Sequence, residues 1–154
     1  MATHRPSRPV YATLIGVAAL AYVLDQGSKL WAQRALADGH TQDLVGSFLR
    51  LRLTANPGAA FNMGSGSTWV MTLIAAVILV VIVRFSRRLG SRSWAVTLGL
   101  LLGGALGNLT DRIIQPPGPF RGHVIDFIDY NGWFIGNVAD IAIVLGAALV
   151  AWLT

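Results

Sequence analysis

All seven acidic residues of this chain are aspartates, and four of them fall between residues 111 and 140. Asp126 lies within the apolar run VIDFI, and Asp140 follows Asn137 at the start of a long apolar segment. If the chain folds back between them, the two carboxylates meet in a poorly solvated place, where one retains a proton. One group then acts as a base and the other as an acid, which together can add water to a peptide carbonyl. The spacing alone also fits a proton relay or an ion site.

A second polar group follows a run of glycines in the segment GGALGNLTDR. A helix would project Asn108, Asp111 and Arg112 from one side. Asp111 and Arg112 either form an ion pair that fastens the end of a helix, or Arg112 anchors a substrate carbonyl while Asp111 orients it. Glycines at such spacing let membrane helices approach closely. They are Gly103, Gly104 and Gly107.

Asp25 lies four residues before Lys29, a spacing at which the two side chains meet on one face of a helix. The pair serves either as a structural ion pair or as part of a site. Asp129 has different neighbours, because the residues YNG that follow it are typical of a turn. We therefore expect Asp129 to face solvent.

The remaining acids lie in the polar stretch ADGHTQD, and we expect Asp38, Asp43 and His40 to be solvated surface residues. The chain has no cysteine, which excludes a disulfide and a thiolate nucleophile. Its histidines are scattered at positions 4, 40 and 123, so we expect no metal centre.

The composition is that of a membrane protein. Of the 154 residues, 54% are hydrophobic and 12% are charged, against about 25% charged residues in a typical soluble domain. The mean hydropathy is +0.59. The net charge of +5 is then explained by basic loops on one side of a membrane, and we expect no nucleic-acid partner.

Four segments reach or approach the roughly 20 mostly apolar residues that a helix needs to cross a membrane. The predicted spans are 10–31, 68–85, 94–114 and 137–153. Tryptophans lie near their ends, as expected at a membrane interface: Trp31, Trp69, Trp94 and Trp152. A competing interpretation is a cleavable signal peptide ending near ALA at 35–37, but the first apolar run is long for that and the later spans need no signal.

Arginines precede the first span and fill the short link between the second and third: Arg5, Arg8, Arg84, Arg87, Arg88 and Arg92. The positive-inside rule therefore places both termini in the cytoplasm. The connections 32–67 and 115–136, with the acid-rich stretch, then face outward.

Local patterns predict the structure of these outer connections. LRLRLT alternates as a half-exposed strand does, and Pro57-Gly58 then turns the chain, so we predict a small extracytoplasmic β-sheet in the first outer loop. The insert QPPGPFRG at 115–122 excludes a continuous helix there. The fold class is thus an all-α integral membrane protein with four transmembrane helices and a small sheet, as one domain over residues 1–154.

Five segments together resemble the sequence blocks of the lipoprotein signal peptidases, also called signal peptidase II. They are DQGSKLW at 25–31, NPGAAFNM at 56–63, GGALGNLTDR at 103–112, GHVIDFID at 122–129 and NVADIAI at 137–143. The blocks occur in the family order from the first predicted span to the last. As a set they are highly specific.

The resemblance implies a bacterial inner-membrane aspartic protease that removes signal peptides from prolipoproteins just before a diacylglyceryl-modified cysteine. The catalytic aspartates of the family fall in the last two blocks, which here means Asp126 and Asp140. The same matching implies residues that position the substrate or support the pair: Asp25, Asn56, Asn108, Asp111, Arg112 and Asn137. It implies no cofactor, contact with membrane lipids and sensitivity to the cyclic peptide antibiotic globomycin, and we expect a monomer.

The fifth block departs from the family pattern, because Gly136 stands where Phe usually precedes the Asn, and the interval from Asp126 to Asp140 is short. We therefore expect the loop over the site, residues 129–136, to be trimmed or differently packed. Two rival functions remain: a proton- or ion-coupled transporter with the aspartates as a relay, and a scaffold that assembles through its glycines. A relay requires acids spread through the membrane depth, whereas these map near the outer boundary.

Overall fold

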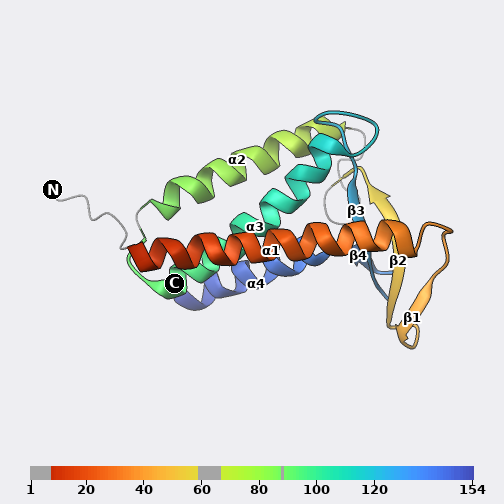
Figure 1. Cartoon of the computed structure of the whole chain (residues 1–154), viewed down its shortest axis with the longest axis horizontal. Coiled ribbons are helices and arrows are strands. Elements are labelled where there is room, and N and C mark those ends of the chain that lie inside the picture. Colours follow the sequence, from red (N-terminus) through yellow and green to blue (C-terminus); the bar gives the residue numbers. More distant parts are fainter. Residues whose placement is uncertain (1–7, 59–66, 88) are drawn as a thin grey trace.

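The computed structural model describes residues 8–58, 67–87 and 89–154. Four helices and four strands follow one another along these residues (Figure 1). The elements are α1 (Arg8–Ala35), β1 (Gln42–Val45), β2 (Leu49–Asn56), α2 (Thr68–Ser86), α3 (Arg92–Ile114), β3 (Val124–Tyr130), β4 (Phe134–Gly136) and α4 (Val138–Leu153).

Within the described residues, α1, α2 and α3 are long and apolar enough to cross a membrane. The predicted spans at 10–31, 68–85 and 94–114 correspond to these helices, which extend them by a few residues. The fourth predicted span corresponds to α4, which is apolar but has only 16 residues. It is therefore shorter than the roughly 20 residues expected of a crossing helix.

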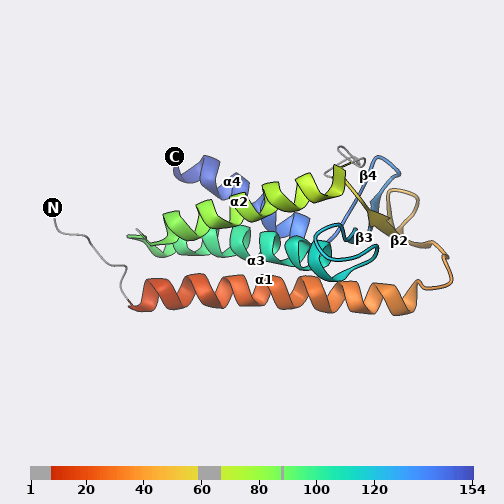
Figure 2. The same cartoon turned by 90° about the horizontal axis from the view of Figure 1, so that it is seen from above.

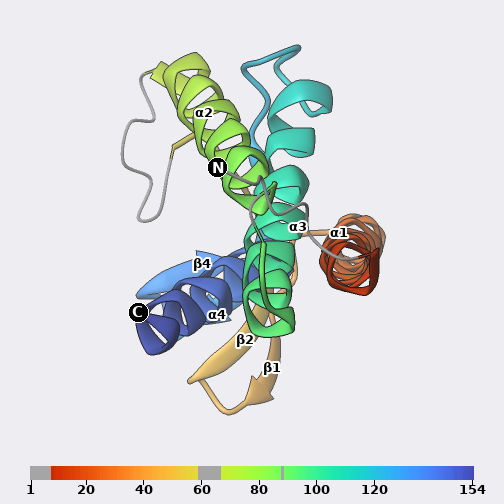
Figure 3. The same ribbon diagram turned by 90° about the vertical axis from the view of Figure 1, so that its left-hand side faces the viewer.

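Helix α3 is the centre of the bundle, with α1, α2 and α4 arranged around it (Figure 3). Half of its most apolar window is buried, compared with 11% for α2. Its glycines permit this position: a Cβ on Gly103 would lie 2.5 Å from the Ala18 carbonyl oxygen of α1, and one on Gly104 would lie 2.6 Å from that of Ala139 in α4. The predicted packing role of the glycines is confirmed.

The four strands form one antiparallel sheet in the order β1-β2-β3-β4. The predicted strand over LRLRLT is β2, and the first connection supplies β1 and β2 of the predicted sheet, but β3 and β4 come from the second connection. Five of the seven residues of β3 are buried, and the other two are half-buried. A strand buried on both faces shows no alternation, so its sequence pattern did not reveal it.

The sheet lies at one end of the helical bundle, which we call the sheet end (Figure 1). The opposite end holds the start of α1, the end of α4 and the link between α2 and α3 (Figure 2). We call it the arginine end, because Arg8, Arg84, Arg87 and Arg92 lie there. Arg5 and Arg88 lie outside the described residues.

The link between α3 and the sheet follows the predicted break. Helix α3 ends at Ile114, and the Pro-rich insert forms turns in which Phe120 has a φ of 63°. The Thr72 hydroxyl of α2 donates a hydrogen bond of 2.7 Å to the Phe120 carbonyl. This contact joins the insert to α2 at the sheet end.

Candidate active site

A cavity of about 270 Å³ lies where α2, α3 and α4 meet the sheet. Asp126 of β3 and Asp140 of α4 both line it, and we call them the aspartate pair. The other polar lining residues are Asn56, Asn108 and Arg112. Much of the remaining wall is apolar, with Met71, Ile74 and Ile78 from α2 and Ile143 from α4. The cavity thus combines two carboxylates with an apolar slot between helices.

Asp126 is held by amide groups on both of its oxygens. Its side chain is 2% exposed. Asn56 Nδ2 donates to its Oδ2 (3.0 Å), and Asn137 Nδ2 donates to its Oδ1 (2.6 Å). The pairing of β2 with β3 places Asn56 and Asp126 near each other, because Thr54 lies opposite Asp126 in the ladder.

Asp140 lies in the first turn of α4, in a capping box with Asn137. The Asn137 N–H donates to Asp140 Oδ2 (3.1 Å), and the Asp140 N–H donates to Asn137 Oδ1 (3.0 Å). Asn108 Nδ2 of α3 donates to the other carboxylate oxygen (3.0 Å). Asn137 therefore contacts both members of the aspartate pair.

Burial, and then the negative charge of Asp140, raises the pKa of Asp126 to about 7. The hydrogen bonds from Asn56 and Asn137 act in the opposite direction, because they stabilise the ionised form. Near neutral pH the pair can thus hold one proton between its two carboxyls, which is the state that serves as both acid and base.

Arg112 faces the same cavity but is not paired with Asp111. It donates from Nη1 to the Pro57 carbonyl (3.4 Å) and from Nη2 to the Gly58 carbonyl. The predicted Asp111–Arg112 ion pair is not what the structure shows, because Asp111 lies 2.8 Å from Lys29 instead. Adjacent residues of an α-helix point about 100° apart, so the two side chains face different neighbours.

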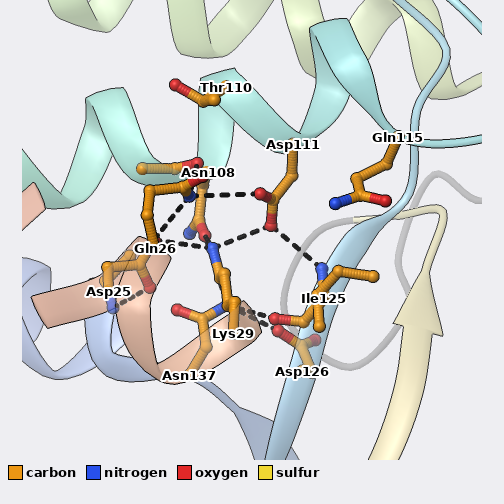
Figure 4. Close-up of polar contacts among 12 residues, drawn as sticks. Asp25, Gln26, Lys29, Asn108, Thr110, Asp111, Gln115, Ile125, Asp126 and Asn137 are labelled. Atoms are coloured by element: carbon orange, nitrogen blue, oxygen red, sulfur yellow. Dashed lines mark hydrogen bonds and ion pairs between the residues drawn. The ribbon is translucent and has the colours of Figure 1, made fainter. Parts of the chain in front are cut away.

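Asp25, Lys29 and Asp111 form a second buried group beside the pair, which we call the Lys29 cluster (Figure 4). Lys29 Nζ lies 2.8 Å from a carboxylate oxygen of each aspartate, so the predicted Asp25–Lys29 ion pair is present. None of the three residues is more than 2% exposed. Gln26 Nε2 also donates to Asp111 (3.2 Å), a partner that the sequence did not indicate.

The prediction that Asp129 faces solvent was wrong. Its carboxylate is fully buried and lies 3.1 Å from Arg50 Nη2 and 3.4 Å from Arg52 Nε. It also accepts a hydrogen bond from the Gly132 N–H (2.6 Å). The turn that follows Asp129 was read correctly, but only the β2–β3 register, which sets Arg50 opposite Asp129, reveals its ion pairs.

Asp38, Asp43 and His40 are exposed, as predicted, and His40 contacts the Asp38 carboxylate. Among the described residues, no group of three or more His or Asp side chains could hold a metal ion.

Gly136 is accommodated by its neighbour Phe134. A Cβ at position 136 would lie 2.6 Å from the Phe134 ring and 2.9 Å from Asp140 Oδ2. The ring of Phe134, which also lines the cavity, thus occupies the space beside Asp140. This packing accounts for a glycine directly before Asn137.

A family model described as signal peptidase (SPase) II matches residues 17–154. The lipoprotein signal peptidase of Streptomyces griseus subsp. griseus is 47% identical over 150 residues, which cover 97% of this chain and 76% of the relative. That of Mycobacterium avium is 45% identical over 150 residues, which cover 97% of this chain and 82% of the relative.

Two solved structures of bacterial membrane enzymes are also similar. One has a TM-score of 0.76 and 28% identity, and the match covers 97% of this chain and 90% of that chain. The other has a TM-score of 0.79 and 26% identity, covering 99% and 97%. The arrangement of helices and sheet is therefore shared with known membrane enzymes.

Proposed function

Because the chain belongs to the lipoprotein signal peptidase (signal peptidase II) family of aspartic peptidases, we propose that it removes signal peptides from bacterial prolipoproteins by cutting before a diacylglyceryl-modified cysteine. We propose Asp126 and Asp140 as its catalytic residues. One observation carries this assignment: the two carboxylates line one cavity and share Asn137 as a hydrogen-bond partner.

The chemistry follows from a pair that holds one proton. The ionised carboxylate accepts a proton from water as the water oxygen attacks the scissile carbonyl carbon. The protonated carboxyl hydrogen-bonds to the carbonyl oxygen, and a proton then passes to the leaving amine as the C–N bond breaks. The raised pKa of Asp126 lets the pair keep this proton near neutral pH.

The surrounding polar residues hold this arrangement. Asn56, Asn108 and Asn137 donate to the pair directly. Arg112 lines the cavity next to the pair and, in this proposal, fixes the substrate backbone. Asp25 and Asp111 support the pair from the Lys29 cluster without lining the cavity.

We further propose that all four helices cross the membrane. Trp31 and Trp69 lie at the sheet end, and Trp94 and Trp152 lie at the arginine end, as expected of two membrane interfaces. Helix α4 spans roughly 24 Å at 1.5 Å per residue. Local thinning of the bilayer accommodates a helix of this length.

The arginine end then faces the cytoplasm with both termini, and the aspartate pair lies at the outer interface of the inner membrane. The apolar slot beside α2 lets a lipid-bearing substrate enter sideways from the bilayer. Burial of its acyl chains, worth about 0.8 kcal/mol per methylene, holds the substrate with few polar contacts. In this proposal the enzyme acts as a monomer, and globomycin inhibits it as the family resemblance implies.

The rival relay is less well supported. The aspartates of the pair and of the Lys29 cluster all lie near the sheet end, whereas a relay needs acids through the depth of the membrane. A transporter would also move its ions whether or not a prolipoprotein substrate is present.

The test is cleavage of a diacylglyceryl-modified prolipoprotein by purified, lipid-reconstituted protein. We expect wild type to cut, and Asp126→Asn and Asp140→Asn to be inactive. Asp43→Asn is the matched control, because Asp43 is exposed on β1. If wild type does not cut, or both variants still do, the assignment is refuted.

A further inference from the structure

Lys29 is buried next to the aspartate pair without lining the cavity, and all of its donors are used. An ammonium group has three N–H bonds. Lys29 Nζ directs them at Asp25 Oδ2 (2.8 Å), Asp111 Oδ2 (2.8 Å) and Asn108 Oδ1 (3.0 Å). Lys29 thereby joins two ion pairs of α1 and α3 to an asparagine of the site.

The two acids of the Lys29 cluster each hold the backbone just before one member of the pair. Asp25 Oδ1 accepts the Ala139 N–H (2.8 Å), one residue before Asp140. Asp111 Oδ2 accepts the Ile125 N–H (3.0 Å), one residue before Asp126 (Figure 4). The two catalytic carboxyls therefore start from backbone positions that are tied to a single cation.

Lys29 also reaches Asp140 through a third route. Asn108 accepts from Lys29 with its Oδ1 and donates with its Nδ2 to Asp140 Oδ1 (3.0 Å). The bond from Lys29 orients the Asn108 amide so that its nitrogen points at the carboxylate. A donor placed in this way fixes the rotamer of the carboxyl that it contacts.

From these contacts we infer that Lys29 is the positioning residue of the site: through Asp25, Asp111 and Asn108 it sets the relative placement of Asp126 and Asp140. The inference rests on the proposed function, because it gives Lys29 a role in that reaction. A small displacement of reacting groups lowers turnover strongly while substrate binding is little changed.

The charge of Lys29 adds a second, separable consequence. Burial and the charge of Asp140 raise the pKa of Asp126, and the positive charge of Lys29 opposes them. The other groups that face Asp126 are Asn56 of β2, Asn137 before α4 and Arg112 of α3. Loss of the Lys29 charge therefore raises the pKa of Asp126.

The experiment compares Lys29→Met, which keeps a long unbranched side chain without the charge, with Lys29→Arg, which keeps the charge. We expect Lys29→Met to lower kcat by about tenfold or more with KM within about twofold of wild type. In the same variant, the decrease of kcat/KM at high pH, which we call the alkaline limb, should move to higher pH. Lys29→Arg should recover part of kcat and leave the limb in place, and Arg34→Met, an exposed cation on the same helix, should match wild type.

The double variant Lys29→Met/Asp111→Asn guards against misfolding, because it removes one positive and one negative charge and so keeps the net charge of the cluster. We expect it to fold and still to have low kcat. The inference would be overturned if folded Lys29→Met, or the folded double variant, had the kcat of wild type and an alkaline limb at the same pH. If wild type cuts and Asp126→Asn does not, such a result refutes the role of Lys29 alone and leaves the proposed function standing.

Discussion

The aspartate pair and the Lys29 cluster are both buried at the sheet end, and they differ in what compensates their charge. In the cluster, a lysine ammonium lies 2.8 Å from each carboxylate. Among the residues that the structure describes, the carboxylates of the pair receive hydrogen bonds from amide side chains and a backbone N–H. A buried carboxylate without an adjacent cation can retain a proton near neutral pH.

The buried acids of the two groups have different roles. The carboxylates of the cluster accept hydrogen bonds from backbone N–H groups of β3 and α4 and hold them in place. The pair keeps its carboxyls directed into a cavity, where exchange of a proton with water is possible. Loss of a carboxylate from the pair should therefore lower turnover, whereas loss of a carboxylate from the cluster should lower stability.

The largest expected effect is on turnover in Asp126→Asn, which should lower kcat by roughly 10²- to 10⁴-fold. The same variant should unfold no more easily than wild type. The pKa of Asp126 is raised in the folded state, so its contribution to stability is lost as pH rises through about 7. Above that pH, the neutral Asn removes a buried charge, and thermal unfolding in detergent should show an equal or higher Tm.

Asp111→Ala should show the converse effect, a loss of stability. It leaves Lys29 with one carboxylate fewer and removes the acceptor for the Ile125 N–H. Breaking a buried ion pair in this way lowers the free energy of unfolding by about 3–5 kcal/mol. Denaturant titration in micelles measures this loss, with the exposed Asp38→Ala as control. A stable Asp111→Ala protein would remove the distinction between the two groups.

Much of this arrangement could be predicted from local sequence. Apolar runs indicate the helices, and the five blocks single out the pair because they gather its residues into a recognisable order. The Asp25–Lys29 pair was predictable from helical spacing alone. In each case the pattern lies within one short segment of chain.

What the sequence did not reveal depends on contacts between distant segments. Arg50 and Asp129 meet only because β2 pairs with β3, and Lys29 and Asp111 meet only because glycines bring α1 close to α3. No local pattern encodes either register. The surroundings of Asp129 suggested a surface turn, and the turn exists, but the carboxylate points to partners on strand β2.

The pH dependence of wild type tests the pair against the cluster directly. If the proton required for catalysis resides on Asp126, kcat/KM should fall above about pH 7. The decrease should approach about tenfold per pH unit, as for a single ionisation. The measurement is initial rate at low substrate concentration across the pH range. A flat profile through this region would assign the proton elsewhere.

The smallest expected effect is a shift of that alkaline limb in Asn56→Ala. Asn56 Nδ2 donates 3.0 Å to Asp126 Oδ2 and stabilises the ionised form, so its loss raises the pKa of Asp126. The limb should move up by about half to one pH unit. Turnover falls as well, since one side of the carboxyl is no longer held.

Gln42→Ala is the matched control, because it removes an exposed amide from the same sheet. Its pH profile should coincide with that of wild type. If the limb moves down in Asn56→Ala, amide hydrogen bonds are not what restrains the proton affinity of Asp126. The compensation of the pair would then have to come chiefly from charge, as in the Lys29 cluster, and the contrast between the two groups would be one of degree.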